Sequence, residues 1–214
     1  MKTPKSILKE IQRREAERLR RESLPQFEFT NFCFNAQTDF FRGSGSRFRA
    51  AVCSRRAGKT VGIVADALDT ILNEKNVTCL YVTLTKGSAR GIIWQDLVRI
   101  IDEYDLDIKL NNVRLEALCE STGSRFEIAG AKDNTEIEKF RGKKLRKVYL
   151  DEAQSFRSYI KYFVDDILIP CLRDLKGSLY ITGTPGPVKA GYFYDVSQSK
   201  EWNNHKWTAF DNPH

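Results

Sequence analysis

Long hydrophobic runs are missing from this chain of 214 residues. No stretch approaches the roughly 20 apolar residues that a membrane-spanning helix needs. No apolar run follows the first lysines, as it would in a signal peptide. We therefore expect a soluble, unsecreted protein that has no membrane partner.

The cysteine spacing that a disulfide framework or a zinc site would need is also missing. The five cysteines are odd in number, widely scattered and free of Cys-x-x-Cys spacing. Neither a disulfide framework nor a zinc site is therefore indicated, and a reducing cytoplasm is the expected environment. Internal repeats and low-complexity tracts are absent too, so the length predicts one ordinary domain with a short appendage.

Positive charge is in excess, with 35 Lys and Arg against 28 Asp and Glu. This balance favours an anionic partner such as nucleic acid without requiring one. Charges are dense in residues 6–23, where a narrow apolar stripe predicts a helix that must end before Pro25. We interpret residues 1–26 as a basic helical arm. It either contacts DNA or a neighbouring subunit, or lies as a solvated helix on the domain at residues 27–214.

The segment Cys-Ser-Arg-Arg-Ala-Gly-Lys-Thr at residues 53–60 lies between an apolar run and a helical pattern. This is the setting of a phosphate-binding loop, in which backbone N–H groups and a helix N-terminus hold phosphates. Lys59 would reach the β- and γ-phosphates, and the Thr60 hydroxyl would bind Mg²⁺. Cys53 stands where glycine is usual, which puts the loop geometry in question and predicts sensitivity to thiol reagents. The predicted nucleotide-binding residues of the loop are Ser54, Arg55, Arg56, Ala57, Gly58, Lys59 and Thr60.

Nucleotide hydrolysis also requires a carboxylate for the metal shell and a base that orients water. Asp151 and Glu152 follow the apolar run at residues 148–150 and fit those roles. Because successive strand residues point in opposite directions, we expect Asp151 to face the metal and Glu152 to face the water. An acidic pair after a strand could instead cap the next helix, but the phosphate-binding loop upstream favours the catalytic interpretation.

Basic residues are concentrated at two places besides the arm. Arg55 and Arg56 lie inside the loop, where holding a phosphate requires no guanidinium group. We interpret Arg55 as a cis group that stabilises charge on the γ-phosphate; the alternative is that both arginines pair with acidic neighbours. Six of the nine residues at 139–147 are basic. They form a solvated loop, a contact to DNA phosphates, or a turn at Gly142 that delivers Arg141 to a neighbouring subunit's nucleotide site.

Two further sets of polar residues are candidates for the site. Thr182, Gly183 and Thr184 close an apolar run and could sense the loss of a γ-phosphate, although in isolation they indicate only a turn. Gln37 lies ahead of the first strand. Its amide could donate to and accept from an adenine edge, or belong to an ordinary helix-capping cluster.

The hydrophobic pattern predicts an α/β fold with a mainly parallel central sheet flanked by helices. Helices are expected at residues 61–72 and 88–104, and a short antiparallel β insertion or sheet edge between the second and third core strands. The core strands are expected at residues 48–52, 77–84, 148–150 and 178–181, and the insertion at residues 108–110, 113–118 and 125–129.

The order of these motifs along the chain resembles the ATPase domain of the large terminase subunit of tailed bacteriophages. The motifs are Gln37, the arginine-bearing phosphate loop, Arg141-Gly142, the Asp151-Glu152 pair and Thr-Gly-Thr-Pro at residues 182–185. The resemblance covers about residues 27–214 and implies a P-loop NTPase of the ASCE, RecA-like type that hydrolyses ATP with Mg²⁺.

The resemblance also implies a role for each matching residue. Gln37 would contact adenine, Arg141 would act in trans, and residues 182–184 would couple hydrolysis to movement. The hydrolytic residues would be Arg55, Lys59, Thr60, Asp151 and Glu152.

The implied assembly is a homo-oligomeric ring that moves double-stranded DNA at the procapsid portal in the host cytoplasm. Its partners would be the portal protein, the small terminase subunit and a C-terminal nuclease domain or subunit. Members of the family continue into a metal-dependent nuclease domain, whereas this chain ends at His214, so we expect an ATPase half without nuclease activity.

Three other classes of nucleotide-binding protein compete with this interpretation. A superfamily-2 helicase shares the glutamine and the Asp-Glu-Ala box but needs a second motor domain. A nucleotide-dependent switch would require neither Glu152 nor Arg55. A small-molecule kinase would not need the base Glu152 and would usually carry an arginine-bearing lid, which the sequence does not show.

Overall fold

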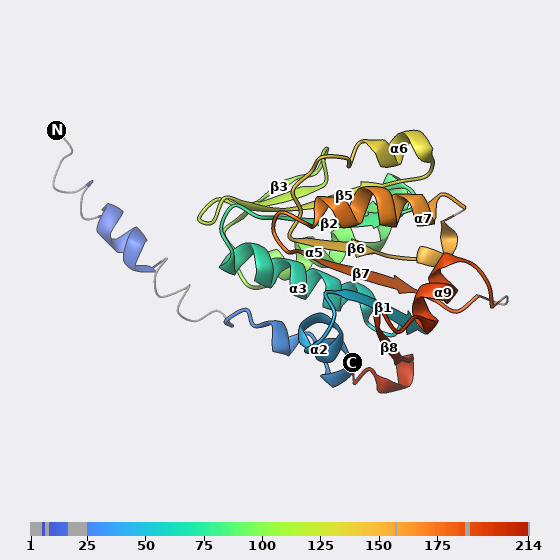
Figure 1. Cartoon of the computed structure of the whole chain (residues 1–214). Coiled ribbons are helices and arrows are strands. Elements are labelled where there is room, and N and C mark those ends of the chain that lie inside the picture. The colour runs from blue at the N-terminus through green and yellow to red at the C-terminus, as the bar shows by residue number, and fades with distance from the viewer. Residues whose placement is uncertain (1–5, 7–8, 17–24, 157, 187–188, 214) are drawn as a thin grey trace.

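The computed structural model describes residues 6, 9–16, 25–156, 158–186 and 189–213. An eight-stranded sheet with helices on both faces forms the body of the protein (Figure 1). Its order is β3-β4-β5-β2-β6-β7-β1-β8. The bounds are β1 (Phe48–Cys53), β2 (Thr78–Thr83), β3 (Ile108–Asn111), β4 (Glu116–Cys119), β5 (Ser124–Gly130), β6 (Lys147–Leu150), β7 (Ser178–Gly183) and β8 (Asn203–Trp207).

The helical segments connect these strands, and the longest follows the phosphate-binding loop. The α-helices are α2 (Asn35–Arg42), α3 (Lys59–Asn73), α4 (Lys86–Ala89), α5 (Gln95–Glu103), α6 (Asn134–Glu138), α7 (Ile160–Tyr162), α8 (Ile169–Cys171) and α9 (Tyr192–Gln198). Short 3₁₀ turns are η1 (Phe29–Asn31), η3 (Ala153–Ser155) and η5 (Ala209–Asp211), and π-helical segments are η2 (Arg90–Trp94) and η4 (Phe163–Leu168). Among the described residues, no helix combines the length and apolar character needed to cross a membrane.

The parallel part of the sheet is larger than the sequence predicts. Strands β5, β2, β6, β7, β1 and β8 run parallel to one another, whereas β4 is antiparallel to both β3 and β5. The predicted antiparallel insertion is present. Its last strand, β5, also pairs with β2 along the whole length of β2. β5 is therefore a core strand that joins the insertion to the parallel sheet.

Strand β8 has no counterpart in the sequence-based prediction. Its sequence Asn-Asn-His-Lys-Trp is polar, and only Trp207 is buried. Since β8 lies at the edge of the sheet and pairs only with β1, it needs no continuous apolar run. Hydrophobic periodicity alone could not have located it.

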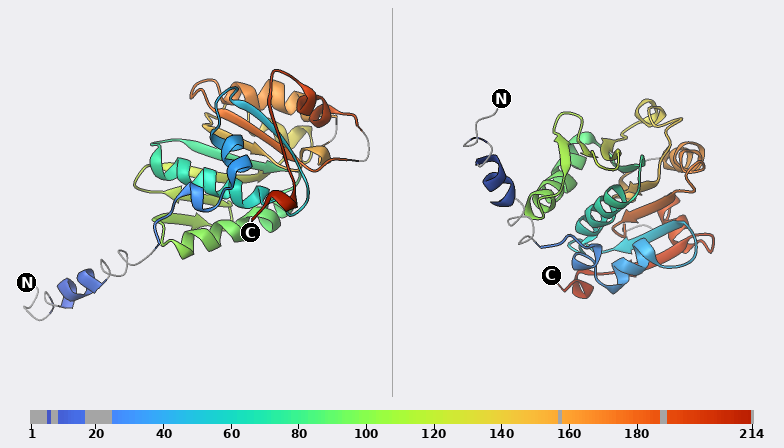
Figure 2. Two further views of the ribbon diagram at one scale, coloured as in Figure 1. Left: turned by 90° about the horizontal axis from the view of Figure 1, so that it is seen from below. Right: turned by 90° about the vertical axis from the view of Figure 1, so that its left-hand side faces the viewer.

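Two hydrophobic clusters cover the two faces of the sheet (Figure 2). On one face α2, α3 and α5 bury residues such as Phe40, Ile63 and Leu97. On the other, α6 and the helical stretch α7-η4-α8 bury residues such as Ile137 and Phe163. Because the central strands contribute side chains to both clusters, their residues are apolar on both faces and form continuous apolar runs in the sequence.

The predicted arm is helical at residues 9–16, the part that the structure describes between the first residues and the domain. Seven of these eight residues are exposed, and Figures 1 and 2 show the helix apart from the sheet. Arg13 and Arg14 both lie near the Glu10 carboxylate, at 3.6 and 3.3 Å. For these residues the structure does not support a helix lying on the domain.

Candidate nucleotide site

The carboxyl ends of β1, β6 and β7 meet at one edge of the sheet, because these strands are parallel and β7 lies between the other two. The loop after β1 holds Ser54 to Gly58, β6 is followed by Asp151, and β7 leads to Thr184. Residues that are widely separated in the sequence are thereby brought together. This is the edge at which open α/β sheets bind their ligands.

The backbone of the phosphate-binding loop adopts left-handed conformations at two positions. Gly58, with φ of 73°, precedes α3, and Arg56 has φ of 58°. Cys53 is not among the residues with positive φ, since it ends β1 in register with Trp207. Cysteine is therefore compatible with the first position of this loop, because the backbone there does not require glycine.

The Cys53 thiol is fully buried, and burial raises its pKa to about 12. A thiol of this kind is protonated at neutral pH, and the thiolate is the reactive form. The burial of Cys53 therefore argues against the expected sensitivity of the site to thiol reagents. The sequence could not show this, because it does not reveal that the side chain points into the core.

Gln37 and Trp207 brace the loop from opposite ends of the chain. The Gln37 amide nitrogen donates to the carbonyl oxygen of Gly58 at 2.9 Å, and the Trp207 indole nitrogen donates to that of Ala57 at 2.8 Å. A Cβ atom on Gly58 would lie 3.0 Å from the Gln37 amide nitrogen, so glycine is also needed for this close approach. The buried Gln37 carbonyl oxygen has no hydrogen-bond partner among the described residues.

Asp151 is 1 % exposed and is fixed by three hydrogen bonds. Its carboxylate accepts from the Tyr81 hydroxyl at 2.8 Å, the Thr182 hydroxyl at 2.6 Å and the backbone N–H of Glu152 at 2.9 Å. Burial, followed by the charge of Asp151, raises the pKa of Tyr81, so the phenol stays protonated and donates. Two of these bonds go to Oδ1 and one goes to Oδ2, so Oδ2 keeps a further lone pair for another ligand.

The backbone at Glu152 differs from the prediction. Strand β6 ends at Leu150, and Glu152 adopts a left-handed conformation with φ of 53° and ψ of 44°. A turn, and not strand alternation, therefore sets the direction of the Glu152 side chain. A non-glycine residue in this conformation is strained by roughly 1–3 kcal/mol, and such strain is concentrated at functional sites.

Lys59 lies between the loop and Glu152. Its side chain is 8 % exposed, its amino group donates to the Ser54 carbonyl oxygen at 3.3 Å, and it lies 3.9 Å from a Glu152 carboxylate oxygen. An ammonium group held in this way is available to a phosphate that enters the loop.

A magnesium ion fits the donors at this edge. Mg²⁺ prefers hard oxygen ligands and keeps several of its waters, so one hydroxyl and one carboxylate beside a phosphate are enough. The Thr60 hydroxyl in the first turn of α3 and the Asp151 carboxylate after β6 are of this kind. Within the described part of the chain there is no cluster of three or more His, Cys, Asp or Glu side chains that could hold a metal ion by itself.

The arginines of the loop differ from the basic residues at 139–147 in having no partner among the described residues. Arg55 and Arg56 are exposed, and no ion pair or hydrogen bond of their side chains occurs among the described residues. The alternative interpretation, that they pair with acidic neighbours, is therefore not supported. Their charges remain available at the mouth of the phosphate-binding loop.

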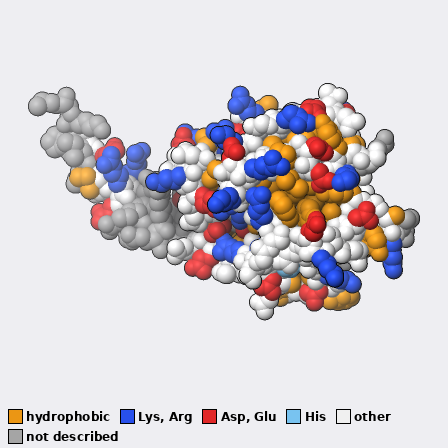
Figure 3. Space-filling view, viewed as in Figure 1, with side chains coloured by type: hydrophobic (Ala, Val, Ile, Leu, Met, Phe, Trp, Pro, Cys, Tyr) orange, Lys and Arg blue, Asp and Glu red, His pale blue; other side chains and the backbone are white. Residues whose placement is uncertain are grey.

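All six basic side chains at residues 139–147 have partners within the chain. Lys139 donates to a backbone carbonyl, and the other five pair with carboxylates, among them Arg146 with Glu74 at 2.6 Å and Lys147 with Asp66 at 2.8 Å. In the space-filling view, blue and red side chains are interspersed over the visible face (Figure 3). The pairing favours a structural role for this segment over a contact to DNA phosphates.

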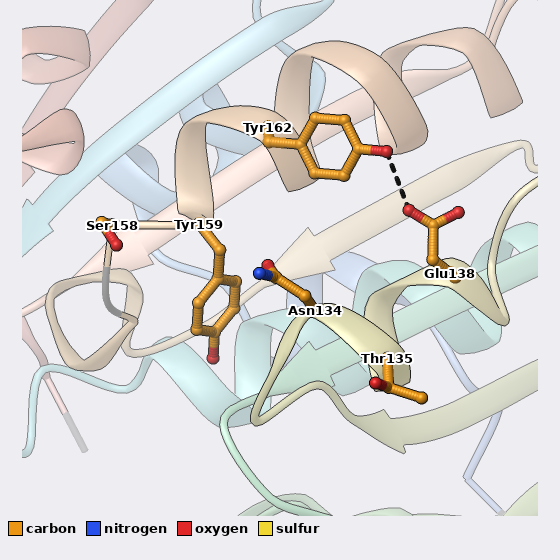
Figure 4. A pocket seen from close by; sticks show the side chains of 6 residues that line it. All are labelled: Asn134, Thr135, Glu138, Ser158, Tyr159 and Tyr162. Atoms are coloured by element: carbon orange, nitrogen blue, oxygen red, sulfur yellow. Dashed lines mark hydrogen bonds between the residues drawn. The ribbon is translucent and has the colours of Figure 1, made fainter.

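Arg141 lies in this segment and is half exposed. Its guanidinium donates to Glu138 at 2.8 Å and to the Tyr162 hydroxyl at 2.7 Å. Hydrogen bonds from Arg141 and then Tyr162 lower the pKa of Glu138. Figure 4 shows Glu138 and Tyr162 at the wall of a cavity of about 610 Å³. None of the contacts described for Arg141 involves the phosphate-binding loop of its own chain.

The residues expected to couple hydrolysis to movement lie beside Asp151. Thr182 donates to the Asp151 carboxylate, and the backbone N–H of Thr184 donates to the Gln154 side chain at 3.1 Å. Strand β7 is therefore linked directly to the acidic pair that follows β6.

Three residues of the site are missed by sequence reasoning. Tyr81 lies in an apolar strand and is indistinguishable from a core residue, and Trp207 lies in a polar strand that was not predicted. Gln154 could have been noticed, because it directly follows Asp-Glu-Ala, but its partners are set by the turn η3.

Comparison with solved structures places this fold among large terminases. The chain has 20 % sequence identity to the large terminase of a thermophilic bacteriophage, with a TM-score of 0.65 over 83 % of this chain and 46 % of that one. It has 18 % identity to the ATPase domain of the Thermus phage P74-26 large terminase, with a TM-score of 0.65 and coverage of 84 % and 83 %. For the HK97 bacteriophage large terminase the values are 14 %, 0.64, 81 % and 39 %.

These likenesses establish the fold. The predicted P-loop fold with a mainly parallel sheet is confirmed, and the chain spans about half of the thermophilic-phage terminase, which has also been solved with ADP and with ATP-gamma-S. No protein-family model matches the sequence. No curated protein matches it either.

Proposed function

We propose that this chain is the ATP-hydrolysing motor domain of a viral DNA-packaging terminase, which couples ATP hydrolysis to the movement of double-stranded DNA into a procapsid. The observation that carries the proposal is the arrangement at one sheet edge. Lys59 lies in the phosphate-binding loop, 3.9 Å from Glu152, while Asp151 is held by Thr182 of the neighbouring strand. A site that only bound nucleotide would need no carboxylate beside the phosphate-binding lysine.

The residues divide the chemistry among them. The loop N–H groups and Lys59 would bind the β- and γ-phosphates, and Thr60 and Asp151 would hold Mg²⁺. When bound, Mg²⁺ neutralises charge on the phosphate oxygens. Glu152 would orient the attacking water and accept its proton at a carboxylate oxygen, and Arg55 would stabilise the charge that develops on the γ-phosphate.

The base side of the nucleotide would be recognised next to Gln37. The Gln37 amide nitrogen is already used by the loop carbonyls, so only its unpartnered carbonyl oxygen is left to accept a hydrogen bond, and because that oxygen is buried, a local opening of the site must expose it to the base. The 6-amino group of adenine is a donor, whereas guanine presents an oxygen at that position. This chemistry supports ATP over GTP as the substrate.

Arg141 is the candidate for a residue that acts on a neighbouring subunit. It is exposed, held by Glu138 and Tyr162, and makes no described contact with its own phosphate-binding loop. The proposal therefore includes a homo-oligomeric ring in which Arg141 completes the next site. It further includes the portal protein, the small terminase subunit and a nuclease domain or subunit as partners, with the procapsid portal in the host cytoplasm as the working location. No observation favours the helicase alternative.

The test is steady-state Mg-ATP turnover per subunit, measured over a range of protein concentrations. We expect Glu152→Gln to lower kcat by roughly 10²–10⁴ while ATP still binds, as removal of a general base does. Glu201→Gln, which changes an exposed carboxylate just before β8, at the sheet edge opposite to the nucleotide site, serves as the matched control. Turnover that survives in Glu152→Gln would contradict the proposal.

The concentration dependence separates the two arginines. Turnover that rises with protein concentration would indicate a site completed between subunits and support Arg141 in trans. Turnover that is flat but above that of Glu152→Gln would indicate a self-sufficient site with Arg55 in cis.

A further inference from the structure

The proposed mechanism assigns no role to Gln154, yet its side chain contacts two residues that have one. It lies in the turn η3 directly after the acidic pair and is exposed at the same sheet edge. Its amide nitrogen donates to the Glu152 carboxylate, and its carbonyl oxygen accepts the backbone N–H of Thr184 at 3.1 Å. One side chain thus bridges the candidate base and the end of β7.

The orientation of the Gln154 amide follows from its partners. A carboxylate can only accept a hydrogen bond, and a backbone N–H can only donate one. The nitrogen must therefore face Glu152 and the oxygen must face Thr184. A flipped amide would place two acceptors together at one end and two donors together at the other.

The strand next to Gln154 is shaped to admit it. A Cβ atom on Gly183 would lie 2.4 Å from the Gln154 carbonyl oxygen and 2.7 Å from the Phe193 ring. Any side chain larger than hydrogen at residue 183 would displace the bridge. The glycine of the Thr-Gly-Thr-Pro segment therefore has a specific steric reason that the sequence does not disclose.

The two links between β7 and the acidic pair differ in their exposure. The bond from Thr182 to Asp151 is buried, whereas both bonds of Gln154 are exposed. Gln154 also lines a cavity of about 1060 Å³, so its side chain has space to move. The buried link holds the strand ends together, and the exposed link can break and form without unpacking the core.

We infer that Gln154 is a positioning residue that holds the Glu152 carboxylate and transmits the state of the nucleotide site to Thr184. The inference rests on the proposed ATPase function for its catalytic part. Movement of Glu152 toward the attacking water changes its bond to the Gln154 nitrogen, and the same amide carries that change to the backbone of the loop after β7.

Three substitutions separate the two halves of the bridge. Gln154→Leu removes both hydrogen bonds, Gln154→Glu keeps an acceptor for Thr184, and Gln154→Lys keeps a donor for Glu152. We expect Gln154→Leu and Gln154→Glu to lower kcat by about tenfold or more with little change in the KM for ATP, as loss of a hydrogen bond to a charged group does, and Gln154→Lys to lower it less. Gln198→Leu removes an exposed amide whose hydrogen bonds among the described residues go only to Ser197, and it is the matched control. Wild-type kcat in Gln154→Leu would overturn the catalytic part.

Amide hydrogen exchange tests the transmission without requiring turnover. Adding Mg-ATP-gamma-S to the wild type should change the exchange of the residue 182–184 amides, and Gln154→Leu should lose that change while still binding the nucleotide. An identical response in both proteins, or no response in the wild type, would overturn the inference. If the wild type shows the response but does not hydrolyse ATP above the Glu152→Gln level, the proposed function fails and the bridge stands.

Discussion

The phosphate-binding loop and the segment at residues 139–147 are both rich in positive charge, but only in the second are all of the charges paired. Arg55 and Arg56 have no partner among the described residues, whereas Lys147 is bound to the buried carboxylate of Asp66. The denser cluster in the sequence is therefore the one less available to a ligand. Charge density indicates that a segment is exposed, while the partners of each charge decide whether it can bind phosphate.

The largest expected effect follows from replacing an unpaired charge. Arg55→Ala should lower the kcat for Mg-ATP by up to roughly 10³–10⁵, the effect of losing an engaged arginine finger. Because Arg55 has no partner among the residues that the structure describes, the free energy of unfolding should stay the same. Turnover and urea unfolding measured on the same preparation would check both statements.

Arg56→Ala tests whether the two arginines of the loop are equivalent. Arg56 has φ of 58°, so its side chain leaves the backbone in a direction different from that of Arg55. We expect a much smaller loss of turnover than for Arg55→Ala. If the two variants lose the same activity, the loop attracts phosphate through general charge and has no dedicated arginine.

Replacing a paired charge should lower the free energy of unfolding and leave the interaction with ATP unchanged. Lys147→Met leaves the Asp66 carboxylate buried and held only by the Tyr149 hydroxyl at 2.7 Å. Losing one partner of a buried pair destabilises a protein by about 3–5 kcal/mol. Urea unfolding should show that loss, while the affinity of the remaining folded protein for ATP should not change.

Lys144→Met is the matched control, because Lys144 pairs with Asp174 at 3.4 Å on the surface and should contribute less than about 1 kcal/mol to the free energy of unfolding.

The buried pair of Lys147 and Asp66 also predicts that the stability depends on pH. Burial lowers the pKa of Lys147, but the charge of Asp66, its hydrogen bond to Lys147 and the nearby Tyr180 and Cys79 together raise the pKa above its usual value of 10.5. Its contribution should therefore be complete below pH 10.5 and be lost as the pH rises through the elevated pKa. Loss near neutral pH would contradict the assignment.

A smaller effect is expected on DNA binding. Neutralising Lys139, Lys143 and Lys144 together should leave the slope of log affinity against log salt unchanged, because a charge that is paired within the chain releases no counterion from DNA. The measurement is binding to a short duplex at several salt concentrations. A flatter slope would show that the pairs break on DNA and would restore the phosphate-contact interpretation.

The smallest expected effect concerns the thiol at the start of the loop. Burial raises the pKa of Cys53 to about 12, so iodoacetamide at pH 7.5 should leave turnover unchanged. Loss of activity that is prevented by Cys53→Ser would show that the loop opens enough to expose the thiol.

Sequence reasoning succeeded where the chemistry is local. The phosphate-binding loop follows a buried strand and opens a helix, so Lys59 and Thr60 can be assigned places from their spacing alone. The acidic pair after β6 and the hydroxyls after β7 are placed by the rule that parallel strands present their carboxyl ends together. The fold class and the common edge were predictable for the same reason.

What could not be predicted depends on contacts between distant segments. The turn that orients Glu152 is a left-handed conformation at a residue with no special propensity for it. The pairing of the basic segment depends on carboxylates such as Glu74 and Asp66, which lie on α3 or just beyond it. Such partners are fixed by packing of the sheet, which a linear pattern does not contain.

The position of β1 in the sheet determines when, during translation, the nucleotide site can be completed. It is synthesised early, but both of its neighbours in the sheet, β7 and β8, come from the last quarter of the chain. The Trp207 indole that braces Ala57 arrives later still. Contacts with such long sequence separation form slowly because a long loop must close first. During translation the nucleotide site therefore stays unfinished until nearly all of these residues have left the ribosome.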